Sequence, residues 1–431
     1  MTSIFVLLAV LTSGVWVAVA IARYGLQTVA FAATGASAFF MPMISLRVAP
    51  SVSIGDALLL SAIGLASTAV LIRRYPLHFR PLRSVTRALV LVVAGGVLGS
   101  LLHGGGSGEL VSFGAGVGSV IVCFGLQDLA PDQIRRLCWA FALGSTTSGL
   151  VGILLGYSVL GSRLYGLSHH PNHLAMVNVL ALGMTLGLVL TTSQGRARSI
   201  GQCLALCHLV IVFMTGSRAG VIGVVVVVGA ATIVTRRRHL AIALGGGATA
   251  LFVVLATGVI TLTDANVLSR LAGGGGASAS DVERADALSS TWETIGDSPI
   301  LGAGFSSARA GHSVPLQLWQ VAGIFGLMAF VVLVATTVRS LRHPHSVLSV
   351  GLWSGYAGYL AASLVSNQLW DRYVWLALAL ASLAAAGGVG LPLDSIRPGS
   401  RSLPRGNLQS SREHRGGRHS ELAIEARGGP V

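Results

Sequence analysis

The stretch GLSHHPNHLA, residues 166–175, places three histidines within five residues of a chain that is otherwise mostly apolar. Pro171 fits the first position of a helix, and Asn172 or Ser168 is suited to cap that helix. Free amides at such a helix start, together with nearby imidazoles, favour an anion such as phosphate. Two alternatives are a purely structural polar cap and a metal site, although no carboxylate or cysteine accompanies the histidines.

A second candidate is FMTGSRAGVIG, residues 213–223, where a few residues with Arg218 among them separate two apolar runs. A tight turn there would hold a guanidinium fork with little freedom, which suits bidentate binding of phosphate. The alternative is an arginine that only extends its guanidinium group toward the membrane surface, without binding a ligand.

The third candidate, residues 281–326, begins with charged residues, continues through Gly-rich turns and ends in an apolar run. Its 284–295 part has the pattern of a short amphipathic helix that would lie in the membrane interface and close over a bound lipid. The residues spaced for one apolar face are Ala285, Leu288, Trp292 and Ile295. His312 precedes the apolar run, where an imidazole with an ordinary pKa near 6.5 can act as a base or only as a hydrogen-bonded loop residue.

The composition determines which elements must position these residues. The 431 residues are 53% hydrophobic and 10% charged, with mean hydropathy +0.75, which excludes a soluble globular fold. We expect an all-α polytopic membrane protein with about 12–13 transmembrane helices. The thirteen apolar runs are 4–22, 25–46, 54–72, 87–103, 110–127, 137–159, 174–192, 200–214, 219–234, 239–262, 313–338, 348–366 and 373–391.

The arginines predict the orientation of these spans. Most of the 29 fall in alternate short loops and in the tail, which by the positive-inside rule puts the N-terminus outside and the C-terminus in the cytoplasm. All three candidates and one long loop, 263–312, then lie on the outer face of the cytoplasmic membrane. The prediction is a transmembrane catalytic domain over 1–392 and a disordered Arg-rich tail over 393–431. The net charge of +14 is spread over loops and tail, so we expect no nucleic-acid partner.

Four pieces in order resemble the O-antigen ligase and polymerase superfamily of membrane glycosyltransferases. They are GLSHHPNHLA, TGSRAG, ERADALSSTWETIGDSPILGAGF and GHSVPLQLWQVAGIFG, and WDRYVW at 370–375 is a weaker match. The resemblance covers about half of the chain, residues 160–376. One departure is Ser313, because the family usually has Asn after the loop histidine.

The resemblance implies a GT-C-like fold and transfer of a glycan from a polyprenyl diphosphate carrier to an acceptor hydroxyl on the outer face. No nucleotide sugar, cofactor or metal is implied, and no D-x-D pair lies on that side. The acceptor would be a glycan, a lipid or a protein, with membrane lipids as further partners.

The candidate residues suit this chemistry. A diphosphate leaving group needs positive charge, for which we expect Arg218 and Arg284, and the acceptor needs a base, for which we expect His312. The residues expected to contact substrate are His170, Asn172, Arg372 and Trp292.

Two other classes fit the same spans: a transporter or flippase for lipid-linked glycans, and a non-catalytic scaffold. A transporter should show two related halves, and the first half has no long outer loop and no counterpart of Arg218. Ligase and polymerase differ only in acceptor, and the sequence does not separate them or specify the sugar, the linkage or the oligomeric state.

Overall fold

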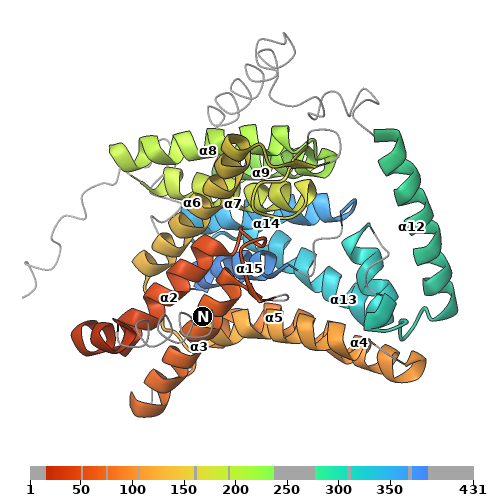
Figure 1. The fold of residues 1–431 in the computed structure, drawn as a ribbon, viewed down its shortest axis with the longest axis horizontal. Coiled ribbons are helices and arrows are strands. Elements are labelled where there is room, and N and C mark those ends of the chain that lie inside the picture. The colour runs from red at the N-terminus through yellow and green to blue at the C-terminus, as the bar shows by residue number, and fades with distance from the viewer. Residues whose placement is uncertain are drawn as a thin grey trace, which may run out of the picture. The chain divides into compact units, whose positions relative to one another are not determined.

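The computed structural model describes residues 16–49, 52–73, 76–104, 106–159, 163–192, 195–236, 277–307, 312–366 and 371–386. These residues form helices joined by short turns (Figure 1). The helices are α2 (Leu26–Phe40), α3 (Ile54–Arg73), α4 (Arg83–His103), α5 (Ser107–Gly125), α6 (Pro131–Leu155), α7 (Pro171–Thr191), α8 (Arg196–Met214), α9 (Arg218–Thr235), α12 (Ala277–Asp297), α13 (Val314–Arg342), α14 (Val347–Ser363) and α15 (Arg372–Ala386). Two single-turn 3-10 helices are η1 (Arg80–Leu82) and η2 (Phe305–Ser307).

Helix length and composition confirm an all-α polytopic membrane protein. Within the described ranges, eight helices are long and apolar enough to cross a membrane: α3, α4, α5, α6, α7, α8, α9 and α13. Three more of the thirteen predicted spans correspond to the shorter helices α2, α14 and α15. The predicted span 239–262, most of 4–22 and the predicted tail lie outside the described residues.

Helix α7 is the most enclosed span, and almost all of its residues are buried. It lies beside α14 in the middle of Figure 1, and glycines of the two helices meet. A Cβ added to Gly183 would lie 2.3 Å from the Cα of Gly355, and one on Gly351 would lie 2.4 Å from the Cα of Gly187. Small residues at such a contact let two helix backbones approach closely, which is how membrane helices associate without a hydrophobic driving force.

Helix α13 is broken at Gly323, although its sequence predicts an uninterrupted span. Gly323 has φ 56° and ψ −142°, a backbone conformation that only glycine adopts without strain. The preceding loop pairs with the opened turn: the Ala303 amide donates to the Gln320 carbonyl at 2.7 Å, and the Ile324 amide donates to the Ile300 carbonyl at 3.0 Å. The loop therefore satisfies backbone groups that the break would leave without partners.

The spans define two ends of the bundle. Because α7 and α14 run antiparallel, as do α4 and α13, the starts of α7, α9 and α13 share one end with the end of α4. We call this the site end, and the end where α4 and α14 begin the opposite end. Two antiparallel hairpins lie at the site end: β1 (Arg47–Ala49) with β2 (Val52–Ser53), and β3 (Ser158–Val159) with β4 (Arg163–Leu164). The sequence pattern does not predict these hairpins.

Candidate functional site

The histidine turn, residues 166–173, leads into α7. The first residue of α7 is Pro171, as the sequence predicts. The cap is neither Asn172 nor Ser168. It is His170, whose Nδ1 accepts a hydrogen bond from the Asn172 amide at 3.1 Å. His169 makes the sharp turn into this cap with φ 63°. An imidazole that accepts at Nδ1 is neutral, and its Nε2–H remains a donor.

Electrostatics keep His170 neutral. Its burial lowers its pKa to about 4, and the charges of His173, Arg163, His312 and Arg284 act in the same direction. The charges of Arg284 on α12 and His312 before α13 thus act on the histidine turn from other segments of the chain.

Asn172 is buried and holds a neighbouring arginine. Its Oδ1 accepts from Arg163 Nη2 at 3.0 Å, and Arg163 Nε donates to the Thr215 carbonyl at 3.0 Å. Since Thr215 lies in the turn between α8 and α9, Arg163 joins the start of α7 to the start of α9. Asn172 thus orients a cation at the site end, a role that the sequence pattern does not suggest.

The turn before α9 fixes the position of Arg218. Gly216 takes φ 62°, and Ser217 caps the helix by accepting from the Gly220 amide at 3.2 Å. Arg218 is the first helical residue, and it forms an ion pair with Asp281 of α12. The tight turn that the sequence predicts is present.

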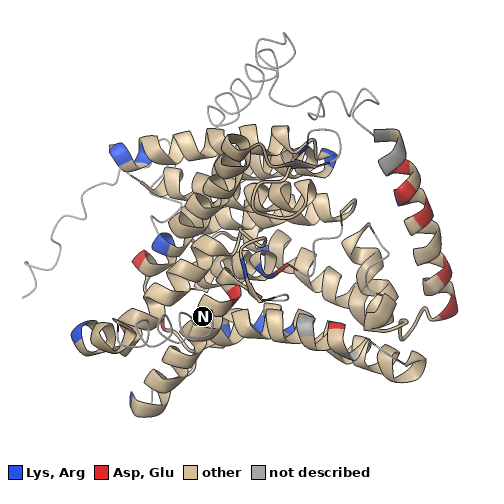
Figure 2. Ribbon diagram, viewed as in Figure 1, with Lys and Arg blue, Asp and Glu red and all other residues tan. Residues whose placement is uncertain are grey.

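Asp281 lies between two arginines. It pairs with Arg218, and its Oδ1 lies 3.8 Å from Arg284 Nη1 one helical turn along α12. Burial and the charge of Arg218 lower the pKa of Arg284 from its usual value, although the guanidinium remains charged at neutral pH. The acidic residues of α12 show in red in Figure 2. Two cations therefore meet at the carboxylate of Asp281, and the charge of Glu283 also acts on Arg284.

His312 lies directly before α13, where Ser313 takes the N-cap position without making a side-chain cap bond. The side chain is half-buried. Burial and the charge of Arg284 lower its pKa below the usual 6.5, and the charge of Glu283 opposes them. His312 is consequently neutral at neutral pH and able to accept a proton beside Arg284.

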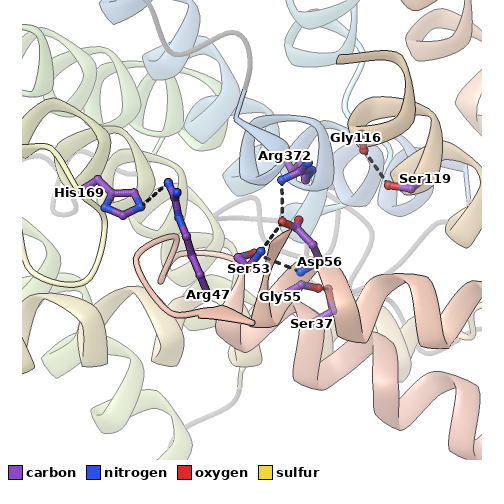
Figure 3. A network of polar contacts seen from close by, with 9 residues as sticks. All are labelled: Ser37, Arg47, Ser53, Gly55, Asp56, Gly116, Ser119, His169 and Arg372. Carbon is purple, nitrogen blue, oxygen red and sulfur yellow. Dashed lines mark hydrogen bonds and ion pairs between the residues drawn. The ribbon is translucent and has the colours of Figure 1, made fainter. Parts of the chain in front are cut away.

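Arg372 belongs to a different group of contacts. Its Nη1 donates to Asp56 Oδ2 at 2.6 Å, and the same oxygen accepts from the Ser53 amide at 2.9 Å (Figure 3). A Cβ on Gly116 would lie 2.9 Å from its Nε, so this glycine leaves room for the side chain. The structure does not bring Arg372 into contact with Arg218 or Arg284, and its observed partners join α15 to α3.

Trp292 lies on α12, which packs against α13. Its ring meets the ring of Trp319 edge to face at 5.8 Å, and it is 49% exposed. The predicted apolar face of α12 is only partly buried. Ile295 is buried, but Leu288 is exposed, and Thr291 is buried in its place. Thr291 can be buried because its hydroxyl donates to the Ala287 carbonyl at 2.7 Å.

Sequence reasoning missed the acidic partners of this site. Asp281 is three residues before Arg284, a helical spacing that could have revealed the pair. Asp371 precedes Arg372 in WDRYVW; its Oδ2 lies 3.1 Å from His173 Nδ1 and accepts from the Tyr373 hydroxyl at 2.9 Å. His173 in turn meets the His170 ring at 5.8 Å.

Asp371 adds a carboxylate beside His173 of the histidine cluster. In the part of the chain that the structure describes, no three His, Cys, Asp or Glu side chains are grouped as a metal site would require.

A comparison with protein families finds a match in the second half of the chain. Residues 203–331 match the family model described as O-antigen ligase, over less than a third of the 431 residues. The matched segment runs from α8 into α13 and contains Arg218, Arg284 and His312. This match confirms the resemblance to the O-antigen ligase and polymerase superfamily. No curated protein matches the chain.

Proposed function

We propose that this chain, with its O-antigen ligase segment, is a membrane glycosyltransferase that moves a glycan from a polyprenyl diphosphate carrier to an acceptor hydroxyl. The observation that carries the proposal is that Arg218 and Arg284 converge on Asp281. Arg218 is the first residue of α9, and Arg284 lies on α12, 66 residues later in the chain. A diphosphate is the leaving group that needs such a pair of cations.

In the proposed reaction, the acceptor oxygen attacks the anomeric carbon of the donor glycan, and the bond from that carbon to the diphosphate oxygen breaks. The two guanidiniums stabilise the charge that develops on the diphosphate, where planar forks can each bind two oxygens. The proton of the acceptor hydroxyl passes to the neutral imidazole of His312. The products are the glycosylated acceptor, polyprenyl diphosphate and one proton.

The remaining side chains would orient the substrates. His170 has a free Nε2–H donor, because its Nδ1 already accepts from the Asn172 amide. We propose that this donor contacts the diphosphate and that Asn172 acts through Arg163. Trp292, half-exposed beside Trp319, would contact the carrier lipid or a sugar ring. Arg372 would act at most indirectly, because Asp56 holds it.

We further propose that the site faces the outside of the cytoplasmic membrane and that no metal is required. The arginine distribution and the missing outer D-x-D pair support these two points. The acceptor class stays open between another carrier-linked glycan, a lipid and a protein.

The test is transfer by the purified full chain in detergent, with a polyprenyl-diphosphate oligosaccharide, a panel of acceptors and mass analysis of products. We expect product with and without EDTA, and a loss of about 100-fold or more in the Arg218→Ala/Arg284→Ala variant. The matched control is Arg196→Ala/Arg198→Ala, which removes two arginines from the start of α8 at the opposite end.

The assay in detergent also distinguishes an enzyme from a transporter or a scaffold, because detergent micelles enclose no compartment into which a substrate could be transported. A transporter or a scaffold would form no glycosylated product with any acceptor. Full transfer by the Arg218→Ala/Arg284→Ala variant would contradict the assignment of the diphosphate site.

A further inference from the structure

A cavity of about 650 Å³ lies at the opposite end of the bundle. It is enclosed by the start of α4, the last turns of α13, the loop after α13, α14 and the end of α15. Its polar lining includes Arg87, Arg339, His343 and His345, with the hydroxyl groups of four Ser and Thr residues: Ser84, Thr336, Ser340 and Ser382. No Asp or Glu is among the described residues that line it.

No acidic residue within the described ranges balances the arginines of this cavity. Arg87 and Arg339 form no ion pair with any described residue. Arg339 lies in the last turn of α13, where the helix dipole favours a cation. Arg83 and Arg87 instead lie in the first two turns of α4, which hold no acid and where the dipole favours an anion.

A buried donor in the cavity wall also lacks an acceptor. Trp353 lines the cavity and is 1% exposed, and its indole Nε1 has no hydrogen-bond partner among the described residues. A buried N–H without an acceptor costs free energy, so a ligand that supplies an acceptor oxygen would relieve this cost. An anion with several oxygens can pair with both arginines of this cavity.

An adjoining groove indicates what carries that anion. This second cavity, about 850 Å³, shares Arg87 and Val332 with the first. Its other lining residues are Leu77, Phe79, Arg80, Arg83, Thr86, Val90 and Leu91. Leu77 and Val90 are more than half exposed, so the groove offers apolar side chains beside the cationic pocket. A free phosphate would leave the groove empty, whereas a lipid would fill both parts.

We propose that the opposite end binds a phosphate-bearing membrane lipid, with its headgroup between Arg87 and Arg339 and an acyl chain along the groove. This lipid is distinct from the carrier at the site end, since the two positions lie at opposite ends of α4 and α13. Basic pockets between transmembrane helices suit anionic headgroups because the arginines there can pair with the phosphate oxygens.

The test titrates delipidated full-length protein in detergent with phosphatidylglycerol, phosphatidylcholine or inorganic phosphate, and follows binding by native mass spectrometry and thermal unfolding. We expect saturable binding of phosphatidylglycerol and little effect of the other two. In Arg87→Gln/Arg339→Gln the affinity should fall about 25-fold, since each arginine near a headgroup contributes about fivefold. Both arginines are exposed, so this variant should keep the unfolding temperature of the lipid-free protein.

The charge-matched control is Arg196→Gln/Arg198→Gln, whose arginines share this end without lining the cavity. It should bind phosphatidylglycerol like the wild type. Trp353→Phe, which keeps a ring and removes the donor, should weaken binding while the arginines remain. Unchanged affinity in Arg87→Gln/Arg339→Gln, equal binding of phosphatidylcholine, or inorganic phosphate that binds as tightly as the lipid would each overturn the proposal.

Discussion

At the level of single residues, the proposed chemistry depends on the shape of two guanidiniums. A lysine at either position keeps the charge but replaces a planar fork by a point charge. We expect Arg218→Ala and Arg284→Ala each to lower the transfer rate by about 100- to 1000-fold, and the lysine variants to recover only part of it. Transfer rates with a polyprenyl-diphosphate oligosaccharide measure this. Full activity in the lysine variants would contradict bidentate binding.

Asp281 gives a second prediction, because it occupies the position between the two arginines. If the donor diphosphate competes with this carboxylate, Asp281→Asn should lower KM for the donor about fivefold, the scale of one partly exposed ion pair. Asp297→Asn at the end of α12 is the control. A raised KM in Asp281→Asn would instead mean that the carboxylate holds the arginines in place for the substrate.

His312 predicts how the rate depends on pH. A base is active when neutral, so the rate should fall as the pH drops through its pKa. Burial and Arg284 lower that pKa, so the acidic limb of kcat/KM should have its midpoint below 6.5. His312→Ala should lower the rate and remove this limb, which a pH profile of both proteins tests. An identical limb in the variant would assign the titration to another group.

At the level of elements, the break in α13 is the feature that pairs with the loop 300–304. An alanine at Gly323 would place its Cβ 2.0 Å from the Ile300 carbonyl oxygen and would strain φ 56°. We expect Gly323→Ala to destabilise the protein by about 1–3 kcal/mol and to reduce transfer, measured by thermal unfolding and product formation.

The comparison variant for this break is Gly229→Ala on α9, where an added Cβ meets no atom within 4 Å. It should leave transfer unchanged and should not destabilise the protein, since alanine is a better helix residue than glycine. If Gly323→Ala behaves in the same way, the opened turn of α13 is dispensable for both folding and transfer.

The helices could be predicted and the break could not. Hydropathy identifies a span by its apolar length alone, and residues 313–338 stay apolar through Gly323. The opened turn depends on the loop 300–304, which pairs with it only after folding. Likewise, periodicity shows that 284–295 is amphipathic, but the packing of α12 on α13 decides that Thr291 is buried and Leu288 is exposed.

At the level of the whole molecule, the site is assembled from segments that sequence analysis could find singly but not join. Arg218, Arg284 and His312 each have a residue type and a setting suited to the chemistry. Their shared neighbourhood follows from helix packing, for which the sequence gives no distance. The acidic partner Asp371 was not predicted for the same reason, because only the fold brings it to His173.

The orientation of the bundle gives the last prediction. If the arginine distribution sets it, Ser290 on α12 faces the outside and Ser199, in the first turn of α8, faces the cytoplasm. Both side chains are exposed. A membrane-impermeant thiol reagent should label Ser290→Cys in intact cells, and Ser199→Cys only after the cells are permeabilised.

The unaltered chain provides the background for this labelling. Its four cysteines lie in the spans α5, α6 and α8, where a water-soluble reagent has little access. Labelling of Ser199→Cys but not Ser290→Cys in intact cells would put Arg218, Arg284 and His312 on the cytoplasmic side. A glycosyl transfer there would have to use donors before they cross the membrane, so this one reversal would refute the proposed outer-face reaction while leaving the geometry of the site intact.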